Sequence, residues 1–394
     1  MSGPYYLNDL GIICPLGHAA REVTRRLFAG ESGLVDTDRY SPGRTIPVGI
    51  VDAVLPAHEE LAVAMRSRNN LLALAAAQQI APAIAAAADR YGAHRVAVVI
   101  GTSTSGIGES EHAIAERQRS GAFPGGFHYA QQELGSSAHA LADAYGLGGP
   151  TSVISTACAS SAKAMASAAR LIALGLADAV VTGGVDTLCG FTVAGFEALD
   201  LVSDRRCNPL SLHRGGINLG EAAALFLMTR EPSAVSLRGW GETTDGYHFS
   251  APDPSGEGAR TAMELALKRA GESAANVEYI NLHGTGTRHN DSMESESVHA
   301  LFGEHVPVSS TKPLTGHTLG AAGALEAAFC WLAMQDSNVE GRLPPHLWDG
   351  ARDPALHPLC VASAGTALGH APRRVLSNSF AFGGANAALV FARE

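Results

Sequence analysis

The chain has 394 residues, 46% of them hydrophobic and 17% charged, so it is long enough for two fused core units and has the composition of a well-buried α/β protein. A formal net charge of −10 without a basic block argues against general nucleic-acid binding, and no apolar stretch reaches the roughly 18–20 residues of a membrane span. The N-terminus lacks a signal-peptide pattern, which predicts a cytoplasmic protein with reduced thiols. The six cysteines form no CxxC pair, which predicts neither a disulfide framework nor a metal site.

Predicted helices and strands alternate along the chain. The first half has a long helical segment over 68–88, a β-run from Val96 into a Gly/Thr turn, a strand, turn and helix over 152–176, and a Gly-rich approach to a β-run over 215–226. The second half has a helix over 258–270, a β-run from Val277 into a Gly/Thr turn, a strand, turn and helix over 307–334, and a Gly-Gly-Ala-Asn segment with a β-run from 383. This alternation predicts parallel or mixed sheets covered by helices.

The shared order of these features favours an internal duplication over chance similarity between Gly/Ala-rich segments. We expect the boundary near Glu-Pro-Ser-Ala-Val at 231–235. The predicted domains are therefore an N-terminal half over 1–232 and a C-terminal half over 233–394.

Cys158 lies where a short β-run and a turn of small residues lead into an Ala- and Leu-rich helix over 161–176. A cysteine at such a junction meets the positive end of the helix dipole and unpaired backbone N–H groups, and both favour thiolate over thiol. The small neighbours Ala157, Ala159 and Ser160 leave room for a substrate to approach the sulfur. A buried structural cysteine is the alternative for a lone cysteine, so the prediction depends on the motifs elsewhere in the chain.

Two histidines lie in turns of the second half. His283 opens His-Gly-Thr-Gly-Thr (283–287) at the end of a strand, and His317 ends Lys-Pro-Leu-Thr-Gly-His (312–317) before a helix. One histidine in a glycine turn would fit a solvated surface residue equally well. Two such turns at corresponding edges of a duplicated fold, with a cysteine at a third, indicate a single reaction centre.

On these motifs the chain resembles the β-ketoacyl-acyl carrier protein synthases, the elongating condensing enzymes (ketosynthases) of fatty-acid and polyketide synthesis. The Thr-Ala-Cys-Ala-Ser block (156–160), the two histidine blocks and the terminal Ser-Asn-Ser-Phe-Ala-Phe-Gly-Gly-Ala-Asn block (377–386) match in order and spacing over essentially the whole chain. The resemblance implies a thiolase-like α/β fold of two duplicated halves in an α-β-α-β-α layered architecture, and a homodimer.

The resemblance also implies an acyltransferase with a role for each matching residue. Cys158 takes an acyl group from the phosphopantetheine arm of an acyl carrier protein, and a decarboxylated malonyl unit attacks the resulting thioester. His283 and His317 donate hydrogen bonds to the enolate oxygen, and backbone N–H groups of Cys158 and Phe382 hold the oxyanion of acyl transfer. Phe382, beside Gly383, gates the site. The enzyme itself is expected to bind no cofactor.

Supporting residues follow from the same motifs. Lys312 is implied to orient the catalytic groups, and Glu294 and Asp291 are implied to belong to an inner polar network. Thr285 and Thr287 are expected to hydrogen-bond the pantetheine arm, although their hydroxyls could instead cap backbone groups of the turn.

An acidic carrier requires a local basic patch on this acidic chain. The candidates for carrier docking are Arg66 and Arg68, which open a predicted helix, and the pair Arg205 and Arg206.

The sequence departs from the family pattern in two places. The family has Arg-Asp-Gly-Phe where this chain reads Arg-Gly-Gly-Ile (214–217), so Ile217 replaces an aromatic residue that lies near the active-site cysteine. The Gly-Thr-Ser-Thr-Ser-Gly-Ile-Gly stretch (101–108), where the family lines its acyl pocket and dimer contact, is not the commonest form either. We expect a specialised enzyme for polyene or other polyketide-like chains rather than the housekeeping fatty-acid enzyme.

Two other functions compete with this interpretation. A non-catalytic chain-length-factor-like subunit would only shape chain length through a shared dimer interface, and a heterodimer with such a subunit is an alternative to the homodimer. A thiolase or acyl hydrolase would act on coenzyme A thioesters. A non-catalytic subunit is disfavoured because the catalytic residues are intact, namely Cys158, His283, His317 and Lys312. Thiolase chemistry is disfavoured by the set of two histidines.

Overall fold

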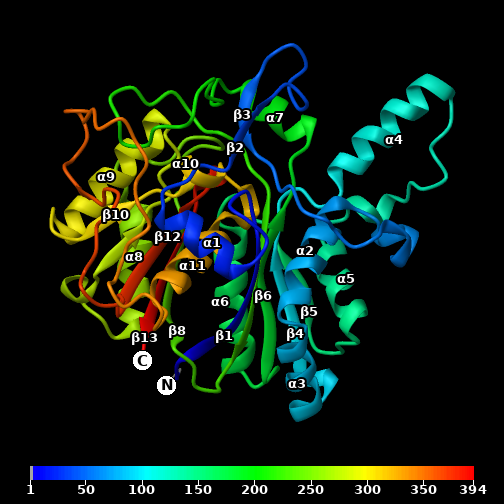
Figure 1. The fold of residues 1–394 in the computed structure, drawn as a ribbon, viewed down its shortest axis with the longest axis horizontal. Helices are drawn as coiled ribbons and strands as arrows, with labels where there is room; N and C mark the ends of the chain where they lie inside the picture. The colour runs from blue at the N-terminus through cyan, green and yellow to red at the C-terminus, as the bar shows by residue number, and fades with distance from the viewer. Residues whose placement is uncertain (1–2) are drawn as a thin grey trace.

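The computed structural model describes residues 3–394 and contains a mixed sheet of eleven strands (Figure 1). The strand order is β11-β10-β9-β12-β13-β8-β1-β7-β6-β4-β5. β1 and β8 join the two halves of this sheet through the antiparallel pairs Tyr5–Leu237 and Tyr6–Ser236. A separate small sheet pairs β2 (Leu34–Thr37) with β3 (Ile46–Gly49).

The two halves of the large sheet have the same strand order and the same strand directions. From the junction outward, the first half contains β1 (Tyr5–Ile13), β7 (Ala222–Thr229), β6 (Ala179–Asp186), β4 (Val96–Gly101) and β5 (Thr151–Ile154). The second contains β8 (Val235–Thr244), β13 (Ala385–Arg393), β12 (Arg374–Phe380), β9 (Tyr279–Asn281) and β10 (Pro307–Ser309), with β11 (Cys360–Val361) at the edge. In each half the first two pairings are antiparallel and the next two are parallel. The predicted duplication is therefore confirmed.

Helices cover the outer faces of the sheet and fill the space between its halves (Figure 1). α6 (Ser160–Ala173) and α11 (Ala322–Ala333) pack against each other in the centre and contact strands of both halves. α2 (Arg68–Gln79), α3 (Ala81–Tyr91) and α5 (Ser136–Tyr145) cover the first half. α8 (Glu257–Ala270) covers the second half, with α9 (Arg288–Phe302) against it. This is the expected layered architecture.

Small residues allow the layers to approach closely. β4 and β6 are buried along their entire length, as strands covered on both faces must be. On β8, a Cβ atom added to Gly239 or Gly241 would lie 2.1 Å or 1.8 Å from a backbone oxygen of α8. Glycine at these two positions is therefore required by the contact between strand and helix.

One predicted element differs from the structure. The single helix expected over 68–88 is two helices, because α2 ends at Gln79 and α3 begins at Ala81 at an angle of 75°. Pro82, in the first turn of α3, has no N–H with which to continue the hydrogen bonds of α2. Among the described residues no single helix is long and apolar enough to cross a membrane, and α2 and α3 meet that test only as this bent pair.

The remaining helices lie at the rim of the sheet or in its connections. α4 projects away from the body in Figure 1 and starts just after the 101–106 turn. The helices of this group are α1 (Ala20–Phe28), α4 (Ile107–Ser120), α7 (Gly190–Glu197) and α10 (Lys312–Thr315).

Candidate active site

Cys158 lies in the turn between β5 and α6, with its side chain almost completely buried. Ala157 has a φ of 49°, a left-handed conformation that is uncommon for a residue other than glycine. Ser160 stabilises the turn, because its Oγ accepts a hydrogen bond from the Thr156 N–H at 2.9 Å and donates one to the Ala157 carbonyl at 2.5 Å. The strained turn fixes the position of the sulfur at the end of the strand.

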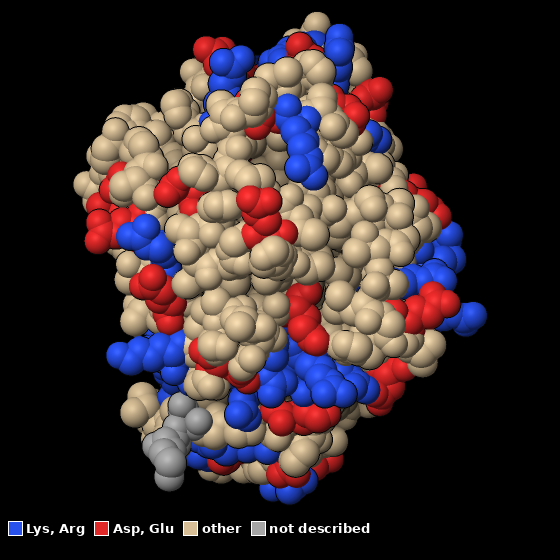
Figure 2. Space-filling model, turned by 90° about the vertical axis from the view of Figure 1, so that its left-hand side faces the viewer, with Lys and Arg blue, Asp and Glu red and all other residues tan. Residues whose placement is uncertain are grey.

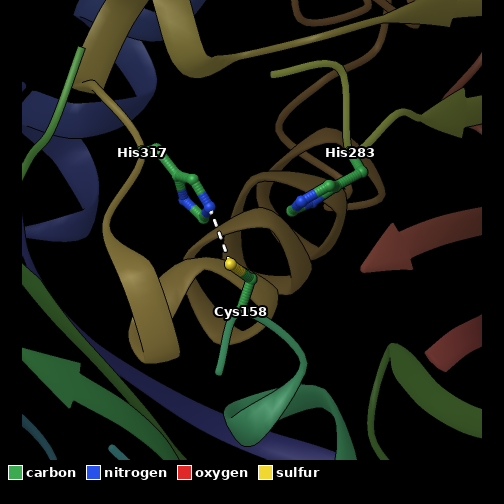
Figure 3. A group of neighbouring side chains, drawn as sticks. All are labelled: Cys158, His283 and His317. Atoms are coloured by element: carbon green, nitrogen blue, oxygen red, sulfur yellow. Dashed lines mark hydrogen bonds between the residues drawn. The ribbon is translucent and has the colours of Figure 1, made fainter. Parts of the chain in front are cut away.

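His283 and His317 approach Cys158 from two turns of the second half (Figure 3). His283 follows β9, and His317 lies between α10 and α11. The Nε2 atom of His317 is 3.0 Å from the Cys158 sulfur. The two imidazole rings are 5.2 Å apart, nearly perpendicular to each other. The structure thus brings together the three residues that the motifs singled out.

The partners of the two rings determine where each carries its proton. The Leu319 N–H donates to Nδ1 of His317 at 3.3 Å, and the Lys312 ammonium lies 3.4 Å from Nδ1 of His283. A nitrogen that faces a donor must present its lone pair, so the proton of each neutral ring is on Nε2. Burial first, and then the charge of Lys312, hold the pKa of both rings well below the usual range. Both rings are therefore neutral donors.

A buried ion pair fixes Lys312. Its Nζ lies 2.5 Å from Oε1 of Glu326, in the middle of α11, and burial raises the pKa of this carboxyl group to about 7. Sequence reasoning did not identify Glu326. The available signal was a single acidic residue in the otherwise apolar segment 322–333, because a buried carboxylate requires a partner.

The thiol of Cys158 differs from the sequence prediction. Burial raises its pKa to about 11, although Lys312 and the backbone N–H groups of Phe382 and Cys158 lower it. The backbone donors favour thiolate, as expected, but the loss of water around the sulfur outweighs them, so the thiol form is favoured.

The same donors form the candidate oxyanion site. Both backbone N–H groups named in the prediction, those of Cys158 and Phe382, act on the sulfur. Phe382 follows β12, and the next two residues, Gly383 and Gly384, have φ angles of 77° and 73°. The Phe382 ring packs against Phe196 of α7, with centroids 5.4 Å apart and the ring planes tilted by 31°.

Two buried carboxylates shape the turn that carries His283. Glu294 accepts the N–H groups of His283 and Gly284, each at 2.7 Å, and burial raises its pKa to about 7. Asp291 accepts the Gly286 N–H at 3.1 Å and, from a different loop, the Leu210 N–H at 2.8 Å. Both residues orient backbone groups of the turn rather than point at the sulfur.

A cavity of about 440 Å³ contains Cys158, His283 and His317. Thr285 and Thr287 also line it, and their hydroxyl oxygens are 2.9 Å apart. Phe196, Ile217 and Phe382 line it as well.

The thiol and the two rings also form a group that could hold a metal ion, because one ligand atom from each lies within 4.8 Å of the others. Ligation through Nε2 requires a lone pair at that atom. The donors at both Nδ1 atoms place a proton there instead. The arrangement fits hydrogen-bond donation to an oxygen better than metal binding.

The four arginines predicted to dock a carrier have different surroundings. Arg205 and Arg206 are exposed. Arg66 is half-buried and donates to the Leu61 carbonyl at 2.8 Å. Arg68 binds the fully buried Glu221 at 2.6 Å, so its charge is already neutralised and it is a poor docking group.

Elsewhere the surface carries charges of both signs. On the face shown in Figure 2, Lys and Arg side chains gather in the lower part, with acidic side chains between them. Ion pairs such as Arg238–Glu394 and Arg374–Glu272 neutralise many surface arginines. Charge alone therefore does not identify the arginines that would dock a carrier, and their position relative to the cavity must be considered as well.

The family described as "Beta-ketoacyl synthase, N-terminal domain" matches residues 10–234, and "Beta-ketoacyl synthase, C-terminal domain" matches residues 234–347. Nodulation protein E of Rhizobium sp. (strain N33) is 32% identical and 3-oxoacyl-[acyl-carrier-protein] synthase 2 of Coxiella burnetii is 30% identical, each over 98% of both chains. A solved Xenorhabdus doucetiae ketosynthase, in complex with its chain length factor, is 41% identical with a TM-score of 0.93, over 99% of this chain and 98% of that one.

Proposed function

The chain belongs to the β-ketoacyl synthase family, and we propose that it elongates an acyl chain, held as a thioester on Cys158, by decarboxylative condensation with malonyl-acyl carrier protein. The observation that carries this proposal is the 3.0 Å contact between Cys158 Sγ and His317 Nε2, beside His283 and inside one cavity. A nucleophile and two neutral donors around one space match the requirements of that reaction.

The first step is acyl transfer. The Cys158 sulfur attacks the thioester carbon of the acyl carrier, the bond to the pantetheine sulfur breaks, and the thiol proton ends on the departing pantetheine. Nε2–H of His317 faces the sulfur at 3.0 Å and stabilises the negative charge that develops there. The backbone N–H groups of Cys158 and Phe382 hold the carbonyl oxygen as it becomes an oxyanion.

The second step is decarboxylation. The bond between the malonyl carboxylate and the α-carbon breaks, CO₂ leaves, and the electron pair forms an enolate whose charge lies on the thioester oxygen. His283 and His317 direct their Nε2–H groups to this oxygen. Neutral rings suit this task, because they donate hydrogen bonds without passing a proton to the carbanion.

The third step is condensation. The enolate carbon attacks the Cys158 thioester, a carbon–carbon bond forms, and the carbon–sulfur bond to Cys158 breaks. The β-ketoacyl chain leaves on its carrier, and the sulfur regains a proton from solvent. Lys312, Glu294 and Asp291 position the groups that act in these steps.

The carrier and its arm complete the proposed site. Thr285 and Thr287, at the cavity wall, hydrogen-bond the pantetheine, and Arg66, Arg205 and Arg206 attract the acidic carrier. We also propose a cytoplasmic location. The six cysteines lie among the described residues and are all free, which supports a reducing compartment.

The pathway and the partner subunit are also proposals. A ketosynthase that is 41% identical is solved in complex with its chain length factor, which supports a dimer with a chain-length-factor-like subunit over a homodimer. Ile217 departs from the usual aromatic, which supports a specialised polyketide or polyene chain.

The test uses purified protein with acyl-carrier and malonyl-carrier. The native protein should release CO₂, form β-ketoacyl-carrier and show an acyl adduct by intact mass. Cys158→Ala should lose both adduct and product, whereas Cys360→Ala, at an exposed cysteine, should keep them. Condensation by the Cys158→Ala variant would contradict the assignment of the nucleophile.

A further inference from the structure

We propose that Arg288 and His289 bind the phosphate of the phosphopantetheine arm at the mouth of the cavity and so select substrates that carry this phosphate. This inference rests on the proposed function, which makes the arm part of the substrate. It assigns a task to two residues outside the predicted site, and the task differs from docking the carrier protein.

The segment that follows β9 forms one wall of the cavity, and its lining side chains become more exposed in chain order. His283 is 1% exposed, Thr285 is 6% exposed and Thr287 is half-buried. Arg288 and His289, at the start of α9, are exposed but still line the cavity. The wall therefore leads from the reaction centre outward to two basic side chains.

A phosphopantetheine arm matches this order of groups. It is a linear chain with the thioester at one end and, at the other, a phosphodiester that joins it to the carrier. The thioester must reach Cys158, and the amide groups in the middle would lie along Thr285 and Thr287. The phosphate, the only charged group of the arm itself, then lies at the mouth, where water still reaches it and charge is least costly to hold.

Arg288 is available to bind an anion. Within residues 3–394, no ion pair involves the side chain of Arg288 or of His289. Arg214, the other arginine that lines the cavity, is already paired with Asp353 at 2.5 Å. Asp200 is the one acid among the lining residues, and it forms no ion pair with Arg288. The charge of Arg288 is therefore not used by another described part of the protein.

The chemistry of the two side chains suits a phosphate. A guanidinium group can donate two parallel hydrogen bonds to phosphate oxygens, and an imidazole ring adds a further N–H donor. The contact lies far from the bonds that change, so it stabilises the bound substrate and the transition state of acylation equally. It should lower the concentration of donor needed for half-saturation and leave the maximal rate unchanged.

The test measures acylation of Cys158, by intact mass, with two small donors that lack the carrier. Acyl-phosphopantetheine and acyl-pantetheine differ only in the phosphate, and the native protein should prefer the first through a lower half-saturating concentration. Arg288→Gln should reduce this preference by about 2- to 10-fold, as expected for one partly exposed charged hydrogen bond. The double variant Arg288→Gln/His289→Gln should remove most of it, whereas Arg288→Lys should keep part of it. Arg352→Gln, at an exposed arginine outside this cavity, is the matched control.

The outcomes separate this inference from the proposed function. Because the preference is a ratio within each variant, reaction with acyl-pantetheine also shows that the site is folded. An undiminished preference in the double variant would overturn the inference. So would a double variant that reacts poorly with acyl-carrier but keeps its preference between the small donors, because the two residues would then bind the carrier itself. Failure of the native protein to be acylated by acyl-carrier, or to condense it with malonyl-carrier, would instead overturn the proposed function.

Discussion

The ammonium group of Lys312 and the carboxylate of Glu326 form an ion pair of 2.5 Å in which the side chains are only 2% and 3% exposed. The pair holds Nζ of Lys312 3.4 Å from the His283 ring. Glu326 thereby reaches the reaction centre through Lys312 and not by direct contact. Loss of Glu326 should affect both stability and activity.

Glu326→Gln should lower the free energy of unfolding by about 3–5 kcal/mol, because Lys312 keeps a buried charge without its counter-charge. Urea unfolding measures this change. Glu340→Gln, which breaks the exposed pair with Arg342, should cost less than about 1 kcal/mol. The double variant Lys312→Met/Glu326→Leu should recover stability but not condensation. If Glu326→Gln and Glu340→Gln lower the free energy of unfolding equally, the argument from burial is refuted.

Glu294 should make stability depend on pH. Its pKa rises from the usual 4.5 to about 7, mainly through burial. The folded protein thus binds this proton more tightly than the unfolded chain. The contribution of Glu294 to the free energy of unfolding is therefore full below pH 4.5 and is lost as the pH rises to about 7. Glu294→Gln should remove a decline on the order of 3 kcal/mol across this window. Urea unfolding at several pH values checks it, with the exposed Glu264→Gln as control; an identical decline in both variants would count against Glu294.

His283 and His317 should separate the steps of the reaction. The His283→Ala variant should still be acylated on Cys158. Its rate of decarboxylation should fall by a factor on the order of 10²–10³, because one hydrogen-bond donor to the enolate oxygen is gone. His317→Ala should slow acylation as well, since its Nε2 contacts the sulfur. Intact mass follows acylation and CO₂ release follows decarboxylation. Equal acylation rates in the two variants would argue against the role of His317 at the sulfur.

Ile217→Phe should narrow the acyl preference. Ile217 is buried and lines the cavity with Phe196 and Phe382, so a larger ring there removes volume that an acyl chain could occupy. Acylation should slow most for the longest chains in a panel of acyl-carriers, measured by intact mass. A uniform change across all chain lengths would show that position 217 does not contact the chain.

Much of the fold could be predicted from the sequence because its signals are local and repeated. Runs such as 96–101 and 151–154 end in glycine or small-residue turns, and their order recurs in the second half. β5 and β10 lie near opposite ends of the strand order. The contact between Cys158 and His317 therefore also needs the packing of α6 against α11 in the centre of the molecule.

Other features depend on packing that the sequence does not display. The pKa of Cys158 is set by how completely the fold removes water from the sulfur. Glu326 contacts Lys312 only because α11 lies in the central layer. The break at Ile80 is different, because Pro82 is visible in the sequence, although the apolar pattern over 68–88 continues through it.

The equivalence of β5–α6 and β10–α11 bears on the origin of the site. Cys158 and His317 occupy matching turns of the two halves, yet their side chains touch each other at 3.0 Å. A protein of two identical halves would place the same residue on both sides of this contact, around an approximate twofold axis. The present chemistry therefore required the two copies to diverge, one retaining a nucleophile and the other a donor, and neither copy alone contains the complete reaction centre.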